Sequence, residues 1–119
     1  MKKIANYMAF RGHSLVSQIR ELLKAHIGAE MPTLNDIAAM FYMSAQTLRR
    51  QLASAGVNFQ KLKNELRCDT AMNLLKLQEL TIEEVSEKVG FSEQSTFYRA
   101  FKKWTGVTPG EYRNTYLAA

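Results

Sequence analysis

Two short stretches of the chain combine arginine with amide-bearing or hydroxyl-bearing residues. They are Gln46, Arg49 and Arg50 in the first stretch, and Gln94, Ser95, Thr96 and Arg99 in the second. Arginine can donate two parallel hydrogen bonds to guanine, and a glutamine amide can pair with adenine, in the major groove of duplex DNA. Thr96 can also offer a methyl group to thymine, whereas Arg99 could read a base or hold a phosphate. These residue types predict two small surfaces that could read base edges.

A second group of polar residues could hold phosphates. It consists of hydroxyl residues at expected helix starts and of nearby cations: Ser44, Thr47, Ser92, Lys102, Lys103 and Arg113. Hydroxyl and backbone N–H groups at a helix start can donate to phosphate oxygens, and cations displace counterions from the phosphate chain. Ser44 and Ser92 are also expected to cap the helices that follow them.

Both stretches belong to a sequence pattern that occurs twice, from Thr33 to Leu62 and from Thr81 to Tyr112. Each copy has a threonine before an apolar residue, a four-residue connection that ends in serine, and an arginine between two large apolar residues. Those last three residues are Leu48, Arg50 and Leu52 in the first copy, and Phe97, Arg99 and Phe101 in the second. A helix, a tight turn and a second helix with a polar, arginine-bearing face are typical of a helix-turn-helix.

The expected elements follow from apolar residues spaced three and four apart. We expect a helix over 14–27, a first helix-turn-helix over 33–56, a linker helix over 58–77, a second helix-turn-helix over 81–105 and a final helix over 109–117. Thr33 with Asp36, and Thr81 with Glu84, are candidate capping boxes. Trp104 is expected to point inward with Phe97 and Phe101. The predicted fold class is all-α, with about seven helices and two helix-turn-helix lobes joined by a long linker helix.

The composition of the chain limits its possible functions less closely than these motifs do. The 119 residues contain 16 Lys and Arg against 11 Asp and Glu, which gives a net charge of +5 and a pI near 9.5. This surplus suits a polyanion, although many basic proteins bind no nucleic acid. The apolar runs are too short to span a bilayer, so no membrane partner is expected. His13 and His26 have no cluster of cysteines or carboxylates beside them, and no metal, cofactor or catalytic residue is expected.

The second copy and its tail resemble the DNA-binding domain of the AraC/XylS family of bacterial transcription regulators. The matching residues are Gly90-Phe91-Ser92, Ser95, Phe97, Arg99 and Phe101-Lys102, followed by Gly106, Thr108, Pro109, Tyr112 and Arg113. The first copy matches through Ile37-Ala38, Ser44, Leu48, Arg50 and Leu52, and the linker through Leu66-Arg67, Ala71 and Leu74-Leu75. One departure is Tyr42, which stands at the turn position that Gly90 occupies in the second copy.

The resemblance implies a non-enzymatic regulator that reads two successive major grooves of an operator or promoter. It implies that residues 13–119 form the DNA-binding domain, after a tail or linker remnant at 1–12. Family members usually carry a separate sensing domain before this one, so the chain is expected to be either a piece of a longer regulator or a short member. RNA polymerase is a further candidate partner, the expected compartment is the cytoplasm, and this domain is expected to be a monomer.

Four alternatives remain open at this point. Arg99 could pair with an acidic residue such as Glu93 rather than meet DNA. The motifs could be architectural parts of a protein-interaction module, or the chain could bind nucleic acid without sequence preference. Related DNA-repair domains transfer alkyl groups to a reactive cysteine, but the sequence around Cys68 lacks the Pro-Cys-x-x-Arg context of that chemistry.

Overall fold

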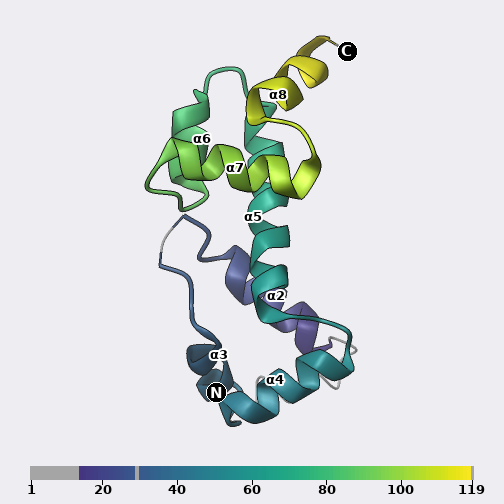
Figure 1. Ribbon diagram of the computed structural model, residues 1–119. Helices are drawn as coiled ribbons and strands as arrows, with labels where there is room; N and C mark the ends of the chain where they lie inside the picture. Colours follow the sequence, from purple (N-terminus) through teal and green to yellow (C-terminus); the bar gives the residue numbers. More distant parts are fainter. Residues whose placement is uncertain (1–13, 29, 119) are drawn as a thin grey trace. The chain divides into compact units, whose positions relative to one another are not determined.

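Helices account for the regular structure of the chain. In a computed structural model, residues 14–28 and 30–118 are described, and within them the chain forms seven helices and no strand (Figure 1). This confirms the all-α class with two helix-turn-helix lobes and a long linker helix. The expected tail at residues 1–12 lies outside the described residues.

The helices have the following bounds: α2 Leu15–Lys24, α3 Leu34–Met40, α4 Ala45–Ser54, α5 Phe59–Leu75, α6 Ile82–Lys88, α7 Gln94–Thr105 and α8 Pro109–Ala118. Helix α2 is shorter than the helix over 14–27 that the apolar spacing predicts. It ends at Lys24, and Ala25 is its C-cap. Ile27 packs instead against the core of the second unit described below. Ile27 therefore continues the apolar spacing of α2 in the sequence but packs in the core of the second unit.

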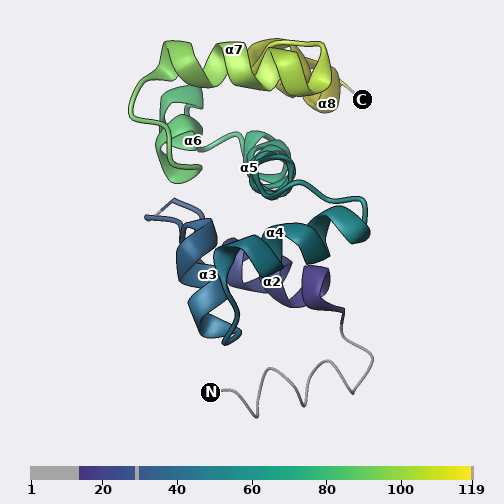
Figure 2. The same ribbon diagram turned by 60° about the horizontal axis from the view of Figure 1, so that its bottom comes forward.

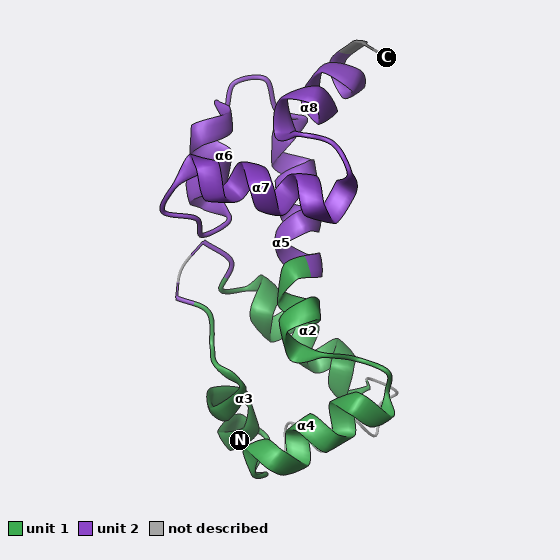
Figure 3. Ribbon diagram, viewed as in Figure 1, with its two compact units in different colours: residues 1–26, 31–64 green, residues 27–30, 65–119 purple. Residues whose placement is uncertain are grey.

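The chain divides into two compact units, each containing one helix-turn-helix (Figure 3). The first unit holds α2, α3, α4 and the part of α5 up to Asn64. The second holds residues 27–30, the rest of α5 from Glu65, and α6, α7 and α8. Helix α5 thus contributes to both units and joins them covalently.

Three helices begin with a reciprocal pair of hydrogen bonds between a threonine and an acidic residue three positions later. The pairs are Thr33 with Asp36, Thr81 with Glu84 and Thr108 with Glu111. The first two confirm the predicted capping boxes. The backbone N–H of each threonine donates to the carboxylate, and this bond lowers the pKa of all three carboxyl groups. Because these pKa values are depressed in the folded state, the caps stabilise above the carboxyl pKa of the unfolded chain and weaken as pH falls.

Each unit buries apolar side chains from both helices of its motif. In the first unit the buried apolar residues include Ile19, Leu23, Ile37, Ala38, Leu48, Leu52 and Leu62. In the second unit the fully buried cluster is Ala71, Leu75, Val85, Val89, Phe97 and Phe101. Figure 2 shows α7 beside α8, and the Phe101 and Tyr112 rings meet there with centroids 5.8 Å apart. These cores fix which face of α4 and of α7 is turned outward.

Trp104 packs against the second cluster, as the spacing predicts, but it is less enclosed than the two phenylalanines of the same helix. It is half-buried and packs at the edge of the second cluster, with its ring centroid 6.1 Å from that of Phe91. Phe97 and Phe101 are fully buried, as the spacing predicts. The largest enclosed side chains of this unit are therefore the two phenylalanines.

Ser86 is a buried hydroxyl without a partner. It is 1% exposed, and its Oγ makes no hydrogen bond among the described residues. The equivalent position of the first copy is Ala38, which is 2% exposed. The second unit therefore buries a polar atom where the first unit buries a methyl group.

Ser86→Ala should raise the free energy of unfolding by about 1 kcal/mol, because it removes an unsatisfied buried hydroxyl with little change in shape. Urea denaturation monitored through the single tryptophan, Trp104, reports on this unit. The matched change Ala38→Ser should destabilise the first unit by a similar amount. A destabilising Ser86→Ala would show that the hydroxyl has a partner in solution.

Candidate nucleic-acid interface

The two helix-turn-helix motifs close their first helix in the same way. After α3, Tyr42 adopts a positive φ of 57°, and after α6 Gly90 adopts 93°. The residue after each one donates its N–H back into the helix, Met43 to the Ala38 carbonyl at 3.0 Å, and Phe91 likewise to Ser86 at 3.0 Å. Both copies thus make the same left-handed turn, although only the second has a glycine there.

The connections differ in length after that turn. In the first copy Ser44 is the N-cap of α4, and its Oγ accepts from the Thr47 N–H at 3.1 Å. In the second copy Glu93 is the N-cap of α7 and makes no side-chain cap bond. The expectation that Ser92 caps the second recognition helix is therefore wrong. The second connection is one residue longer, and that extra residue places Ser92 one position before the cap.

The extra residue also sets which positions of the two helices correspond. Arg50 and Arg99 are each the sixth residue of their helix, counted from Ala45 and Gln94. By the same count Gln46 corresponds to Ser95, Thr47 to Thr96, and Arg49 to Tyr98. The two helices therefore share an arginine at one position and differ in most of the other outward residues.

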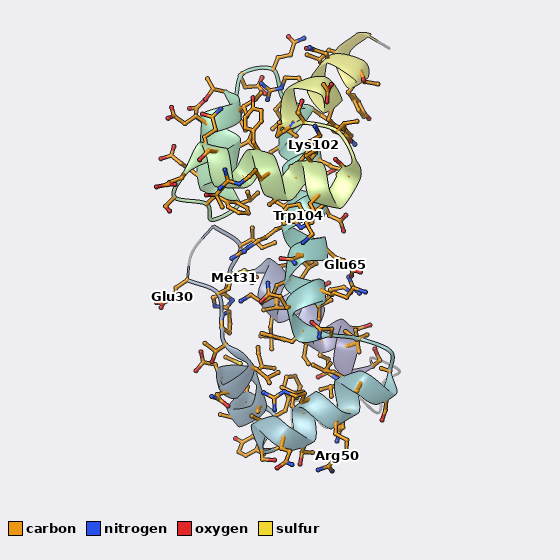
Figure 4. The ribbon with its side chains drawn as sticks, in the orientation of Figure 1. Glu30, Met31, Arg50, Glu65, Lys102 and Trp104 are labelled. Carbon is orange, nitrogen blue, oxygen red and sulfur yellow. The ribbon has the colours of Figure 1, made fainter. Side chains whose placement is uncertain are left out.

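All seven predicted base-reading residues are exposed: Gln46, Arg49, Arg50, Gln94, Ser95, Thr96 and Arg99. Figure 4 shows the Arg50 side chain extending outward from α4. The inward faces of the same helices are filled by buried residues, Leu48 and Leu52 on α4 and Phe97 and Phe101 on α7. Each helix thus presents a polar face opposite a fully buried apolar one.

The arginines of these faces are not held by carboxylates. Within residues 14–28 and 30–118, no ion pair joins Arg99 to Glu93, and none involves Arg49 or Arg50; Lys24 and Glu21, at 3.7 Å, are an example of an ion pair in this part of the chain. The alternative in which Arg99 is neutralised by Glu93 is therefore not observed. A guanidinium group that is in no ion pair can donate to a ligand without first breaking a salt bridge.

The residues that are predicted to contact phosphates differ in their exposure and in their contacts within the chain. Ser44, Ser92, Lys102 and Lys103 are exposed and Thr47 is half-buried. The Ser44 Oγ also donates to the Thr47 Oγ1 at 3.0 Å, so this pair is already joined at the start of α4. Lys102 and Trp104, two residues apart on α7, project to different sides of that helix (Figure 4).

Arg113 has a structural task that the sequence does not reveal. Its Nε donates to the Leu75 carbonyl at 2.8 Å, and its Nη2 donates to the Leu77 carbonyl at 3.0 Å. The guanidinium from α8 thereby satisfies the carbonyl of Leu75, the last residue of α5, where a helix has no internal donors, and also binds the carbonyl of Leu77, two residues beyond that helix. The partners are 38 and 36 residues away in sequence, so no local pattern indicates them.

Arg113→Gln should lower the free energy of unfolding by about 2 kcal/mol, because it removes charge-assisted hydrogen bonds to two carbonyls. It should leave the salt dependence of DNA binding unchanged. The exposed Lys103→Gln is the matched control, and it should leave stability unchanged while reducing the slope of log affinity against log salt by about 1. If Arg113→Gln instead reduced the salt slope and left stability unchanged, Arg113 would be assigned to a phosphate contact.

The reactivity of the single cysteine, Cys68, depends on its surroundings. Burial raises the pKa of the half-buried Cys68 thiol, and the charge of Asp69 raises it further. A thiol of this kind is a poor nucleophile, because the thiolate is the reactive form. No group of three or more metal-ligating side chains occurs in the described ranges. Among the helices described, none combines the length and apolar character that a membrane crossing requires.

Comparison with known proteins gives the class of this fold and site. The family model described as a helix-turn-helix domain matches residues 37–115, from α3 to α8. The chain belongs to the AraC-type helix-turn-helix DNA-binding domain family, a non-enzymatic family of bacterial transcription regulators.

Three relatives illustrate the likeness. The chain is 46% identical over 81 residues to an uncharacterized HTH-type transcriptional regulator of Mycobacterium bovis, covering 68% of this chain and 24% of that protein. A DNA-binding transcriptional dual regulator from Escherichia coli K-12 superposes with a TM-score of 0.81 at 25% identity, covering 87% of this chain and 93% of that one. The DNA-binding domain of AdpA, a global transcriptional factor solved with a target DNA, gives a TM-score of 0.72 at 26% identity over 87% and 93%. The chain thus spans about a quarter of the length of the Mycobacterium relative.

Proposed function

We propose that this chain binds a specific sequence of double-stranded DNA and thereby regulates transcription, with α4 and α7 entering two successive major grooves. The observation that carries the proposal is the division of both helices into a buried apolar face and an exposed face with an unpaired arginine at the sixth position. The recognition helix of a helix-turn-helix meets base edges with such a face. The AdpA domain, of the same fold, was solved with a target DNA.

The exposed residues of the two helices divide by chemistry. Arg50 and Arg99 are proposed to donate two hydrogen bonds each to guanine, and Gln46 and Gln94 to pair with adenine. The phosphate contacts are assigned to four exposed residues and one half-buried one, Ser44, Ser92, Lys102, Lys103 and Thr47. Arg113 is left out of this set because its guanidinium is bound to backbone carbonyls.

The two reading surfaces are unlike, and this predicts an asymmetric site. Gln46 corresponds to Ser95 and Arg49 to Tyr98, so the two helices should prefer different bases. One chain carries both surfaces, and we propose that it binds as a monomer to two unlike half-sites. A cytoplasmic location and a contact with RNA polymerase at the promoter belong to the same proposal.

Two successive major grooves place the half-sites about 10 base pairs apart. The test begins by selecting bound sequences from a random duplex library. Inserting 5 base pairs between the selected half-sites turns the second half-site to the opposite side of the duplex, and affinity should fall to that of a single half-site. Binding that does not depend on the spacing would contradict the two-groove proposal.

The rival functions give different results in the same assay. A protein-interaction module would show no salt-dependent binding to duplex DNA. A nonspecific nucleic-acid binder would show the salt dependence but would enrich no sequence from the library.

A further inference from the structure

Glu93 is an exposed acidic residue at the start of the second recognition helix. It is the N-cap of α7 and directly precedes Gln94, in the connection that joins α6 to α7 (Figure 1). Its side chain makes no cap hydrogen bond, and within the described ranges it makes no other hydrogen bond and no ion pair. The carboxylate is therefore free to accept hydrogen bonds from a ligand that approaches this end of α7.

Helix capping does not account for a glutamate at this position. N-cap positions favour serine, threonine, aspartate and asparagine, whose short side chains accept from N–H groups of the first turn. The N-cap of the first recognition helix is Ser44, and its Oγ accepts from the Thr47 N–H at 3.1 Å. The two recognition helices thus begin differently, because the side chain at the start of α4 is engaged and the one at the start of α7 is not.

The place and the charge of Glu93 match one kind of base contact. The N-terminal residues of a recognition helix meet base edges in the major groove. A carboxylate only accepts hydrogen bonds, and the N4 amino group of cytosine is the donor that suits it there. Guanine presents two acceptors, N7 and O6, and thymine presents the O4 acceptor, so both repel a carboxylate. Adenine is a poorer partner than cytosine, because its N6 donor lies beside the N7 acceptor.

We propose that Glu93 accepts a hydrogen bond from the N4 amino group of a cytosine in the second half-site, and that it disfavours the other three bases at that position. The inference rests on the proposed function, and it adds an acidic specificity-determining residue to the predicted base-reading residues of α7. The first motif lacks this contact, because its N-cap is Ser44. A carboxylate near the phosphate chain also weakens binding to every duplex, so Glu93 adds discrimination and lowers the overall affinity.

The decisive variant is Glu93→Gln, which keeps the length and shape of the side chain and replaces the carboxylate with an amide. An amide can accept from adenine N6 and donate to adenine N7, so we expect the preferred base at one position of the second half-site to change from cytosine to adenine. The ratio of affinities for the cytosine duplex and the adenine duplex should fall about tenfold or more. The affinity for random duplexes should rise, because a negative charge near the phosphates is removed. Repeated selection from the random library, followed by anisotropy on four duplexes that differ at this base pair, measures these effects.

Two further variants keep base reading apart from charge. Glu87→Gln removes another exposed carboxylate of the same unit, on α6, and should leave every base preference unchanged. Glu93→Ala should relax the preference for cytosine without creating a new one.

Unchanged base preferences in Glu93→Gln would overturn the inference. A lower melting temperature in that case would show that the carboxylate only stabilises the positively charged end of α7. A wild-type chain that enriches no sequence from the library would instead contradict the proposed function itself.

Discussion

Phe101→Ala should lower the free energy of unfolding of the second unit by about 3–5 kcal/mol, the usual cost of removing a buried aromatic ring. Phe101 is 0% exposed, and its ring lies 5.8 Å, centroid to centroid, from those of Phe97 and Tyr112. The change would empty space at the contact of α7 with α8 and α5. Urea denaturation followed by Trp104 fluorescence measures the effect.

Two variants bracket this result. Phe101→Leu, which copies the Leu52 of the first motif, should cost less because most of the volume is kept. Trp104→Ala should also cost less than Phe101→Ala, since the indole is half-buried at the edge of the cluster. A larger loss from Trp104→Ala than from Phe101→Ala would show that the tryptophan, not the phenylalanine, is the centre of this core.

Arg50→Ala and Arg99→Ala should each weaken binding to the selected site by about 1–3 kcal/mol, which is roughly 5- to 150-fold. Each loss should be accompanied by relaxed preference at one base pair, because one bidentate contact disappears. The two sites are in different units, so the losses should add in the double variant. Affinities on the selected site and on single-base variants, measured at one salt concentration, test this.

The controls separate base reading from charge. Lys102→Ala should weaken all duplexes alike and flatten the salt slope, as loss of a phosphate contact does. Gln51→Ala, at an exposed position of α4 outside the assigned set, should change neither quantity. Equal losses on selected and random duplexes for the arginine variants would remove the base-reading assignment.

Local features of the fold were accessible from the sequence. The capping boxes of Thr33 and Thr81 follow from residue types three positions apart, and both are present. Apolar spacing on α7 correctly assigned Phe97 and Phe101 to the core. Such signals work because the helix period and the cap geometry are decided within a few residues.

The features that the sequence did not reveal depend on distant contacts or on exact register. The role of Arg113 needs the end of α5, 38 residues earlier, to lie beside α8. The N-cap of α7 is Glu93 rather than the expected Ser92, because one additional residue in the turn shifts the helix start. Ile27 looked like part of α2 but packs in the second unit. Periodicity alone carries no information on which core a residue joins.

The most direct test of the central claim is the ratio of affinities for the selected duplex and for a scrambled duplex of equal length and composition. Fluorescence anisotropy at a fixed, physiological salt concentration gives both values. Sequence-specific binding through two recognition helices predicts a ratio of about 10³ or more in favour of the selected duplex. A ratio near one, at any affinity, would contradict specific reading by α4 and α7.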